Sequence, residues 1–96
     1  MTDYSFVLPP DFSDYEWEVT AKGHFSGATI AAAGAEYRLS FYDAARLSQE
    51  VASELDRGMA FFEPNLIVIS SVNRREMEDA AYGLIRSGQL SALVPA

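Results

Sequence analysis

Alternation of apolar and polar residues predicts strands in the first half of the chain. From Tyr15 to Lys22, apolar side chains fall on one side of an extended backbone, while Glu16 and Glu18 fall on the other. Residues 36–41 alternate in the same way. Between them, residues 27–34 are small or β-branched and are bracketed by glycine, which favours a third strand leading into a hairpin. Strands with one polar face predict an antiparallel sheet that is covered on one side only.

The second half of the chain has the period of two amphipathic helices. Asp43 and Asn73 are suitable N-cap residues, and Gly58 and Gly88 are placed to end the two helices. Residues 66–69 are uninterruptedly apolar, which predicts a buried strand between them. Residues 89–96 can add an edge strand or cover the core. The two apolar stripes comprise Ala44, Leu47, Val51 and Leu55, and then Met77, Ala80, Ala81, Leu84 and Ile85.

These elements predict an α+β fold, a two-layer sandwich in which a mainly antiparallel sheet carries two helices on one face, in the order β-β-β-α-β-α. Residues 1–14 contain aromatic residues and two consecutive prolines without a period, so we expect an extended N-terminal arm. Residues 15–96 then form a single α+β domain. The uncovered face of its sheet would carry Glu16 and Glu18.

Composition limits the compartment and the partners. The 96 residues are 49% hydrophobic, which suffices for one core, and they include no cysteine and no run long enough to cross a bilayer. With no signal-peptide pattern at the N-terminus, we predict a cytoplasmic protein. The net charge is -7 and the seven basic residues are scattered, so we expect neither nucleic acid nor a membrane as a partner.

Catalytic chemistry has little support in this sequence. His24 is the single histidine, which disfavours a multi-histidine metal site and most histidine-dependent catalysis. Ser26 lies one position late for a nucleophile elbow, and the glycines around it favour a hairpin turn. We therefore predict no catalytic residues, no metal, no cofactor and no enzymatic activity.

The leading functional hypothesis is a small acidic protein-binding module. The open sheet face around Glu16, Glu18 and Lys22 would bind a basic protein partner. An immunity- or inhibitor-type protein fits this description, because acidic side chains can imitate phosphates electrostatically.

Two alternatives rely on other features. The first is a homo-oligomeric accessory subunit that completes a larger sheet through its open face or through the strand over residues 66–69. The second is a small anionic-ligand binder or enzyme using the Ser70–Arg75 turn, where a strand passes into a helix N-terminus. Its anion-binding residues would be Ser71, Asn73, Arg74 and Arg75. Phe61 and Phe62 are expected in the core, with an exposed aromatic anchor as the alternative.

Overall fold

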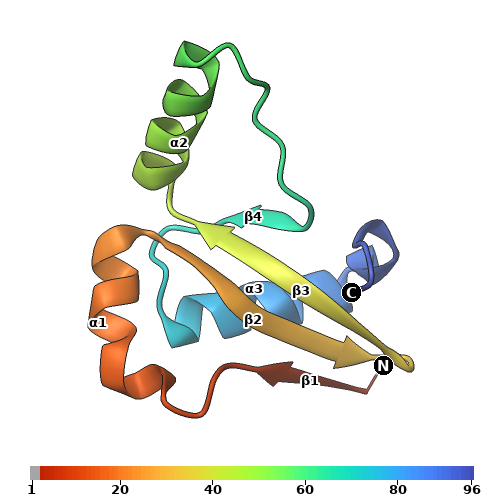
Figure 1. Cartoon of the computed structure of the whole chain (residues 1–96). Coiled ribbons are helices and arrows are strands. Elements are labelled where there is room, and N and C mark those ends of the chain that lie inside the picture. Colours follow the sequence, from red (N-terminus) through yellow and green to blue (C-terminus); the bar gives the residue numbers. More distant parts are fainter. Residues whose placement is uncertain (1–2) are drawn as a thin grey trace.

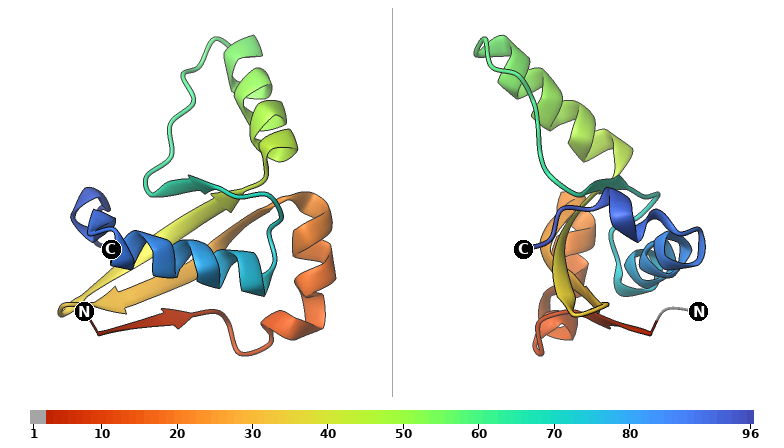
Figure 2. Two further views of the ribbon diagram at one scale, coloured as in Figure 1. Left: turned by 180° about the vertical axis from the view of Figure 1, so that it is seen from behind. Right: turned by 90° about the vertical axis from the view of Figure 1, so that its right-hand side faces the viewer.

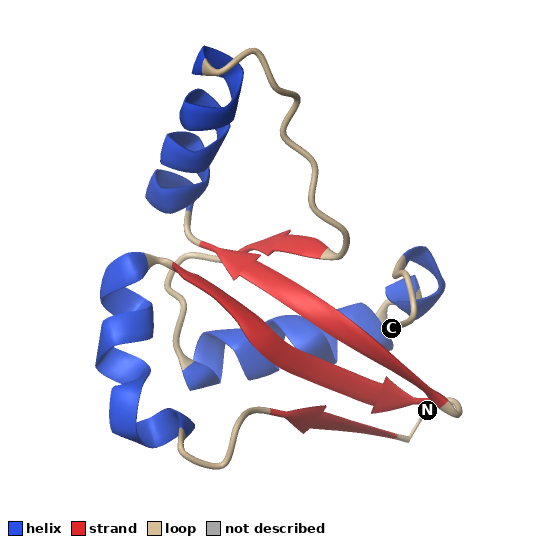
Figure 3. Ribbon diagram, viewed as in Figure 1, coloured by secondary structure: helices blue, strands red, loops and turns tan. Residues whose placement is uncertain are grey.

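The computed structural model describes residues 3–96, which form a four-stranded mixed sheet with three α-helices and a short 3₁₀ helix (Figures 1 and 3). The strand order is β1-β2-β3-β4; the first three strands are antiparallel neighbours, and β4 is parallel to β3. The α+β class, the mainly antiparallel sheet and, in outline, the element order are confirmed, with one additional early helix. Along the chain the elements are β1 (Tyr4–Val7), α1 (Phe12–Lys22), β2 (His24–Ala32), β3 (Ala35–Tyr42), α2 (Ala44–Asp56), β4 (Leu66–Val68), α3 (Arg74–Arg86) and η1 (Gln89–Ala92).

The strand predicted over residues 15–22 is wrong, because this segment belongs to α1. Phe12 and Val19, seven residues apart, lie on one side of the helix and are buried in the core, whereas Trp17 is 71% exposed. The alternating pattern covers only residues 15–22 and so leaves out Phe12. Phe12 and Val19 together define the buried face of the helix. Glu16 and Glu18 therefore project from a helix and not from an open sheet face.

The extended N-terminal arm is in part an edge strand of the sheet. β1 pairs antiparallel with β2, from Tyr4 opposite Ala32 to Val7 opposite Thr29. The predicted boundary at residue 14 is displaced, because α1 already begins at Phe12. Residues 1 and 2 of the predicted arm lie outside the described residues. The backbone groups of β1 that face β2 thus find their hydrogen-bond partners within the domain.

The core lies between the sheet and α3 (Figure 2). Ile30, Leu39 and Phe41 point from β2 and β3 toward that side, and Met77 and Ala81 of α3 are fully buried against them. α1 adds Phe12 and Val19 to the same cluster. The helices that build the core are therefore α1 and α3. α2, expected to cover the sheet beside α3, contributes no buried residue.

The C-terminal tail covers the core and lies along β3. Leu90 and Leu93 pack against the hydrophobic cluster, and the Ala96 N–H donates to the Glu36 carbonyl at 2.7 Å. β4 pairs with residues 40–42 of β3, and the bond from Ala96 reaches the same strand at Glu36. Of the two alternatives for residues 89–96, coverage of the core is observed; the segment forms a 3₁₀ helix and no edge strand.

Candidate functional site

The most prominent feature outside the core is the α2 extension, which we define as residues 43–64 (Figures 1 and 2). It leaves the sheet after Tyr42, forms α2, and returns to β4 through an irregular segment. The predicted N-cap is confirmed, since the Asp43 carboxylate accepts from the Arg46 N–H at 2.7 Å. The apolar stripe along α2 contains no buried residue, and Leu55 at its far end is 60% exposed.

The start of α2 is fixed by contacts with the end of α1. A single residue, Asp43, links β3 to α2, and its N–H donates to the Gly23 carbonyl at 2.9 Å. Gly23 has a left-handed φ of 74° and lies so close to Asp43 that an added Cβ would collide with the carboxylate. The direction in which α2 leaves the sheet is therefore set by a link that is too short to turn the chain back.

A polar cluster fastens the returning segment to the sheet. Glu63 accepts hydrogen bonds from the Ser40 hydroxyl and, at 2.5 Å, from the Tyr42 hydroxyl. The His24 ring stacks on Tyr42 with 4.3 Å between centroids, and its Nε2 lies 3.9 Å from Glu63 without a hydrogen-bond partner. Since Leu39 and Phe41 face α3, the alternate residues Ser40 and Tyr42 face the other side of the sheet. We call these four polar residues the Glu63 cluster.

Electrostatics keep the Tyr42 hydroxyl in its donor form. Burial, followed by the hydrogen bond and the charge of Glu63 and the charge of Glu50, raises the pKa of Tyr42 to about 12, while the Ser40 hydrogen bond acts against this shift. Ser40 is only 5% exposed and donates to Glu63 as well. The two hydroxyls thus hold the Glu63 carboxylate against the sheet.

The α2 extension is acidic, although two of its carboxylates are paired within it. Arg46 contacts Glu50 at 2.9 Å, and Arg57 contacts Glu54. Five carboxylates against two arginines give residues 43–64 a net charge of -3. Phe61 and Phe62 differ in their surroundings. The Phe61 ring packs edge-on to Tyr42 with 6.3 Å between ring centroids, whereas Phe62 is 85% exposed. Leu55 and Met59 of the same extension are exposed as well.

The predicted partner-binding residues lie on α1. Glu18 and Lys22 are exposed there, but Glu16 is half-buried and accepts from the Arg74 N–H at 2.8 Å. Glu16 therefore bonds within the domain and is not part of a free acidic face. The Thr20 hydroxyl donates to the Val72 carbonyl at 2.8 Å and adds a second connection between α1 and the start of α3.

The predicted anion site is already in contact with an anionic group of the chain. Asn73 caps α3 as expected, accepting from the Glu76 N–H at 2.8 Å, and its amide donates to the Ser71 hydroxyl at 3.3 Å. The carboxylate at this helix N-terminus is that of Glu16. The Arg74 guanidinium lies 5.5 Å from the centroid of the Phe12 ring, and Arg75 is exposed. Arg74 also lies 3.9 Å from Glu78, so its contacts are within the chain.

The Glu63 cluster was missed by sequence reasoning because no local pattern contains it. Its members are up to 39 residues apart and meet only through the pairing of His24 with Tyr42 and through the return of residues 57–64. His24, the single histidine, lies at the start of β2 and stacks on Tyr42. The one available signal was Glu63 itself, an acidic residue between Phe62 and Pro64 in an apolar stretch.

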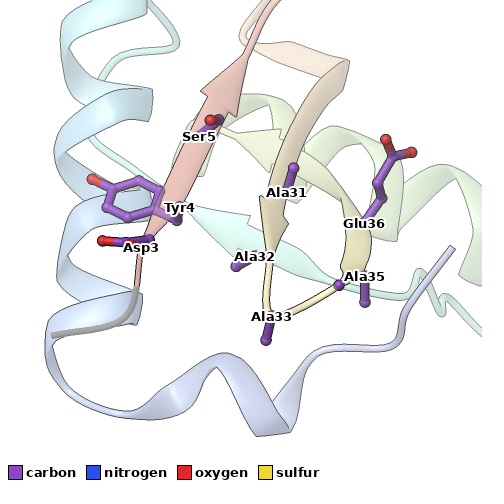
Figure 4. A pocket seen from close by; sticks show the side chains of 9 residues that line it. Asp3, Tyr4, Ser5, Ala31, Ala32, Ala33, Ala35 and Glu36 are labelled. Atoms are coloured by element: carbon purple, nitrogen blue, oxygen red, sulfur yellow. The ribbon is translucent and has the colours of Figure 1, made fainter.

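A hollow of about 530 Å³ lies at the β2–β3 hairpin, bordered by β1 (Figure 4). Its lining is mainly alanine, and the carboxylates of Asp3 and Glu36 point away from each other. Such a site lacks the convergent polar groups that fix a small ligand. Within residues 3–96, no three potential metal ligands come together, and no helix has the length and apolarity needed to span a bilayer.

Comparisons with protein-family models, curated proteins and solved structures give no match for this chain.

Proposed function

We propose that this chain is a non-enzymatic protein-binding module and that the α2 extension is its binding element. The observation that carries the proposal is that α2 has an apolar stripe of which no residue is fully buried: Leu47 and Val51 are half-buried, and Leu55 is exposed. The other two α-helices of the described chain each place at least two side chains in the core. An apolar helix face that the fold leaves uncovered is typical of a surface that another protein covers.

The energetics of a lone helix support a bound partner. A thirteen-residue helix is close to the length at which isolated helices are marginal in water, and here none of its side chains is fully buried against the domain. Complete burial of a leucine or valine side chain is favourable by about 1.5–3 kcal/mol. A partner that covers Leu47, Val51 and Leu55 would therefore supply the tertiary packing that α2 lacks within the described chain.

The charge of the extension indicates the chemistry of the partner. The extension has a net charge of -3 and an apolar stripe along its helix. A matching surface therefore has small or apolar groups at its centre and basic groups at its rim. An inhibitor of a basic, nuclease-like protein is one function of this kind. The α2 extension has better support as the contact surface than Glu16, Glu18 and Lys22, because Glu16 is engaged with α3.

Affinity capture with matched variants tests this proposal. Val51→Asp places a charge on the apolar stripe, whereas Gln49→Asp places the same charge on the exposed polar side of α2. We expect Val51→Asp to weaken partner capture about 100-fold and Gln49→Asp to weaken it less than tenfold, with unchanged thermal unfolding for both. Equal capture by both variants would exclude α2 as the binding element.

A further inference from the structure

The face of the sheet opposite α3 is not covered by any helix of the described chain. Its side chains form two rows across the strands: Val7, Thr29 and Arg38 in one, and Ser5, Ala31 and Glu36 in the other. β1 and β2 contribute only small residues and Val7, which is 49% exposed. Small side chains allow the close approach of a helix. We call the area formed by these six residues the open face.

The topology indicates a helix on that face. β3, α2 and β4 form a parallel β–α–β unit, in which the crossover is right-handed in nearly all known proteins. In the view of Figure 1, with α3 behind the sheet, a right-handed crossover would place α2 in front, over the open face. Figure 2 shows α2 leaning toward that side but extending beyond the end of the sheet. The open face, which would suit the crossover helix, is therefore not covered by α2 of the same chain.

The chain's own α2 is kept away from the open face. The single linking residue, Asp43, is held against Gly23 and leaves no loop in which the chain could reverse. The Glu63 cluster also places the returning segment over Ser40 and Tyr42, at the end of the open face nearest α2. A helix folding back would have to displace Glu63 from both hydroxyls.

We propose that the open face of each chain binds α2 of a second copy, so that two protomers exchange their α2 extensions about a twofold axis. This inference depends on the proposed function, because it uses the same binding element, and it names that element's partner. α2 is about 20 Å long. Two such helix-on-sheet contacts would bury on the order of 1,200–1,600 Å² in total, which is the size of a stable interface. Exchange of an element between identical chains is a common route to dimers.

The open face offers one basic group to an acidic helix. Arg38 is exposed there and has no carboxylate within ion-pair distance among residues 3–96. Glu50 and Glu54 flank the apolar stripe of α2, where each pairs with an arginine of its own chain, and the partner's Arg38 would be a further cation beside them that offsets some of the repulsion between two acidic chains. Glu36 lies nearer the hairpin end of the open face, where it would oppose an acidic helix only at its margin.

Cysteine cross-linking tests the exchange directly, because the chain has no native cysteine. One chain would carry Ala31→Cys on the open face and the other Val51→Cys on α2, with a short bis-maleimide as the linker. We expect a cross-linked heterodimer from this mixture and at least about tenfold less from Ala31→Cys mixed with Gln49→Cys. Sedimentation of the unmodified chain should show a dimer at high micromolar concentration, and Val7→Asp and Val51→Asp should each shift it toward monomer.

Two results would overturn the exchange. The first is a purely monomeric unmodified chain at high concentration. The second is a chain carrying both Ala31→Cys and Val51→Cys that cross-links within monomers, which would place α2 on its own sheet. If the chain is monomeric but Val51→Asp still loses a partner that Gln49→Asp retains, the exchange is rejected and the proposed function stands. If neither assembly nor capture responds to Val51→Asp, both fail.

Discussion

Replacing Asn65 with alanine is expected to lower the free energy of unfolding by about 2–3 kcal/mol. The Asn65 side chain joins three segments: its amide donates to the Arg38 and Val94 carbonyls, and its carbonyl accepts from the Val94 N–H, each at 2.8 Å. Its backbone adopts a left-handed φ of 56°, which asparagine tolerates better than alanine. The variant therefore loses the attachment of the C-terminal tail and gains backbone strain. Urea unfolding followed by circular dichroism measures the change.

Asn65→Gly separates the two causes. Glycine removes the three side-chain hydrogen bonds but accepts the left-handed backbone, so its destabilisation should be about 1 kcal/mol smaller than that of alanine. Amide exchange at Val94 should accelerate in both variants. A change below about 0.5 kcal/mol for alanine would show that the tail contributes little to stability.

Raising the pH from 10 to 12 is expected to reduce stability by about 2 kcal/mol through Tyr42. In the folded state its pKa is about 12, above the ordinary value of 10.0. The folded protein then holds the phenolic proton more tightly than the unfolded chain does. This contribution is fully present below pH 10 and is lost as the pH rises through 12. Chemical denaturation at several alkaline pH values measures it.

Tyr42→Phe is the matched control for the alkaline loss. The variant lacks the titrating hydroxyl, so its stability should decline less between pH 10 and pH 12 than that of the unmodified chain. A smaller decline remains, because partial burial and the nearby Asp11 carboxylate also raise the pKa of Tyr15. Parallel pH dependences for the two chains would show that Tyr42 titrates as an ordinary tyrosine.

Local signals in the sequence predicted the helices that have side-chain caps. The structure confirms the N-caps at Asp43 and Asn73, and each helix starts at the next residue. α1 was misread because its N-cap, Asp11, makes no side-chain cap hydrogen bond, and because Tyr15 interrupts it with non-helical backbone angles. Without those signals, the alternation of residues 15–22 was the strongest local pattern, and it favours a strand. The burial of Phe12, which defines the buried face of the helix, arises from tertiary packing.

The position of α2 could not be predicted from its amphipathic stripe. A stripe indicates that one face of a helix is to be covered, and it contains no information about which molecule covers it. The one-residue link and the close approach of Gly23 to Asp43 become visible only once the ends of α1 and β3 are placed together. The Glu63 cluster likewise depends on strand register, which sets His24 opposite Tyr42.

Hydrogen exchange of α2 at increasing protein concentration tests the central claim that α2 is covered by another molecule and not by its own domain. We predict rapid exchange of the amides in residues 47–56 in dilute protein and progressive protection as the concentration rises, while β2, β3 and α3 remain protected throughout. Protection of α2 equal to that of α3 at the lowest concentration would contradict the account, because it would show that the helix is already packed within a single chain.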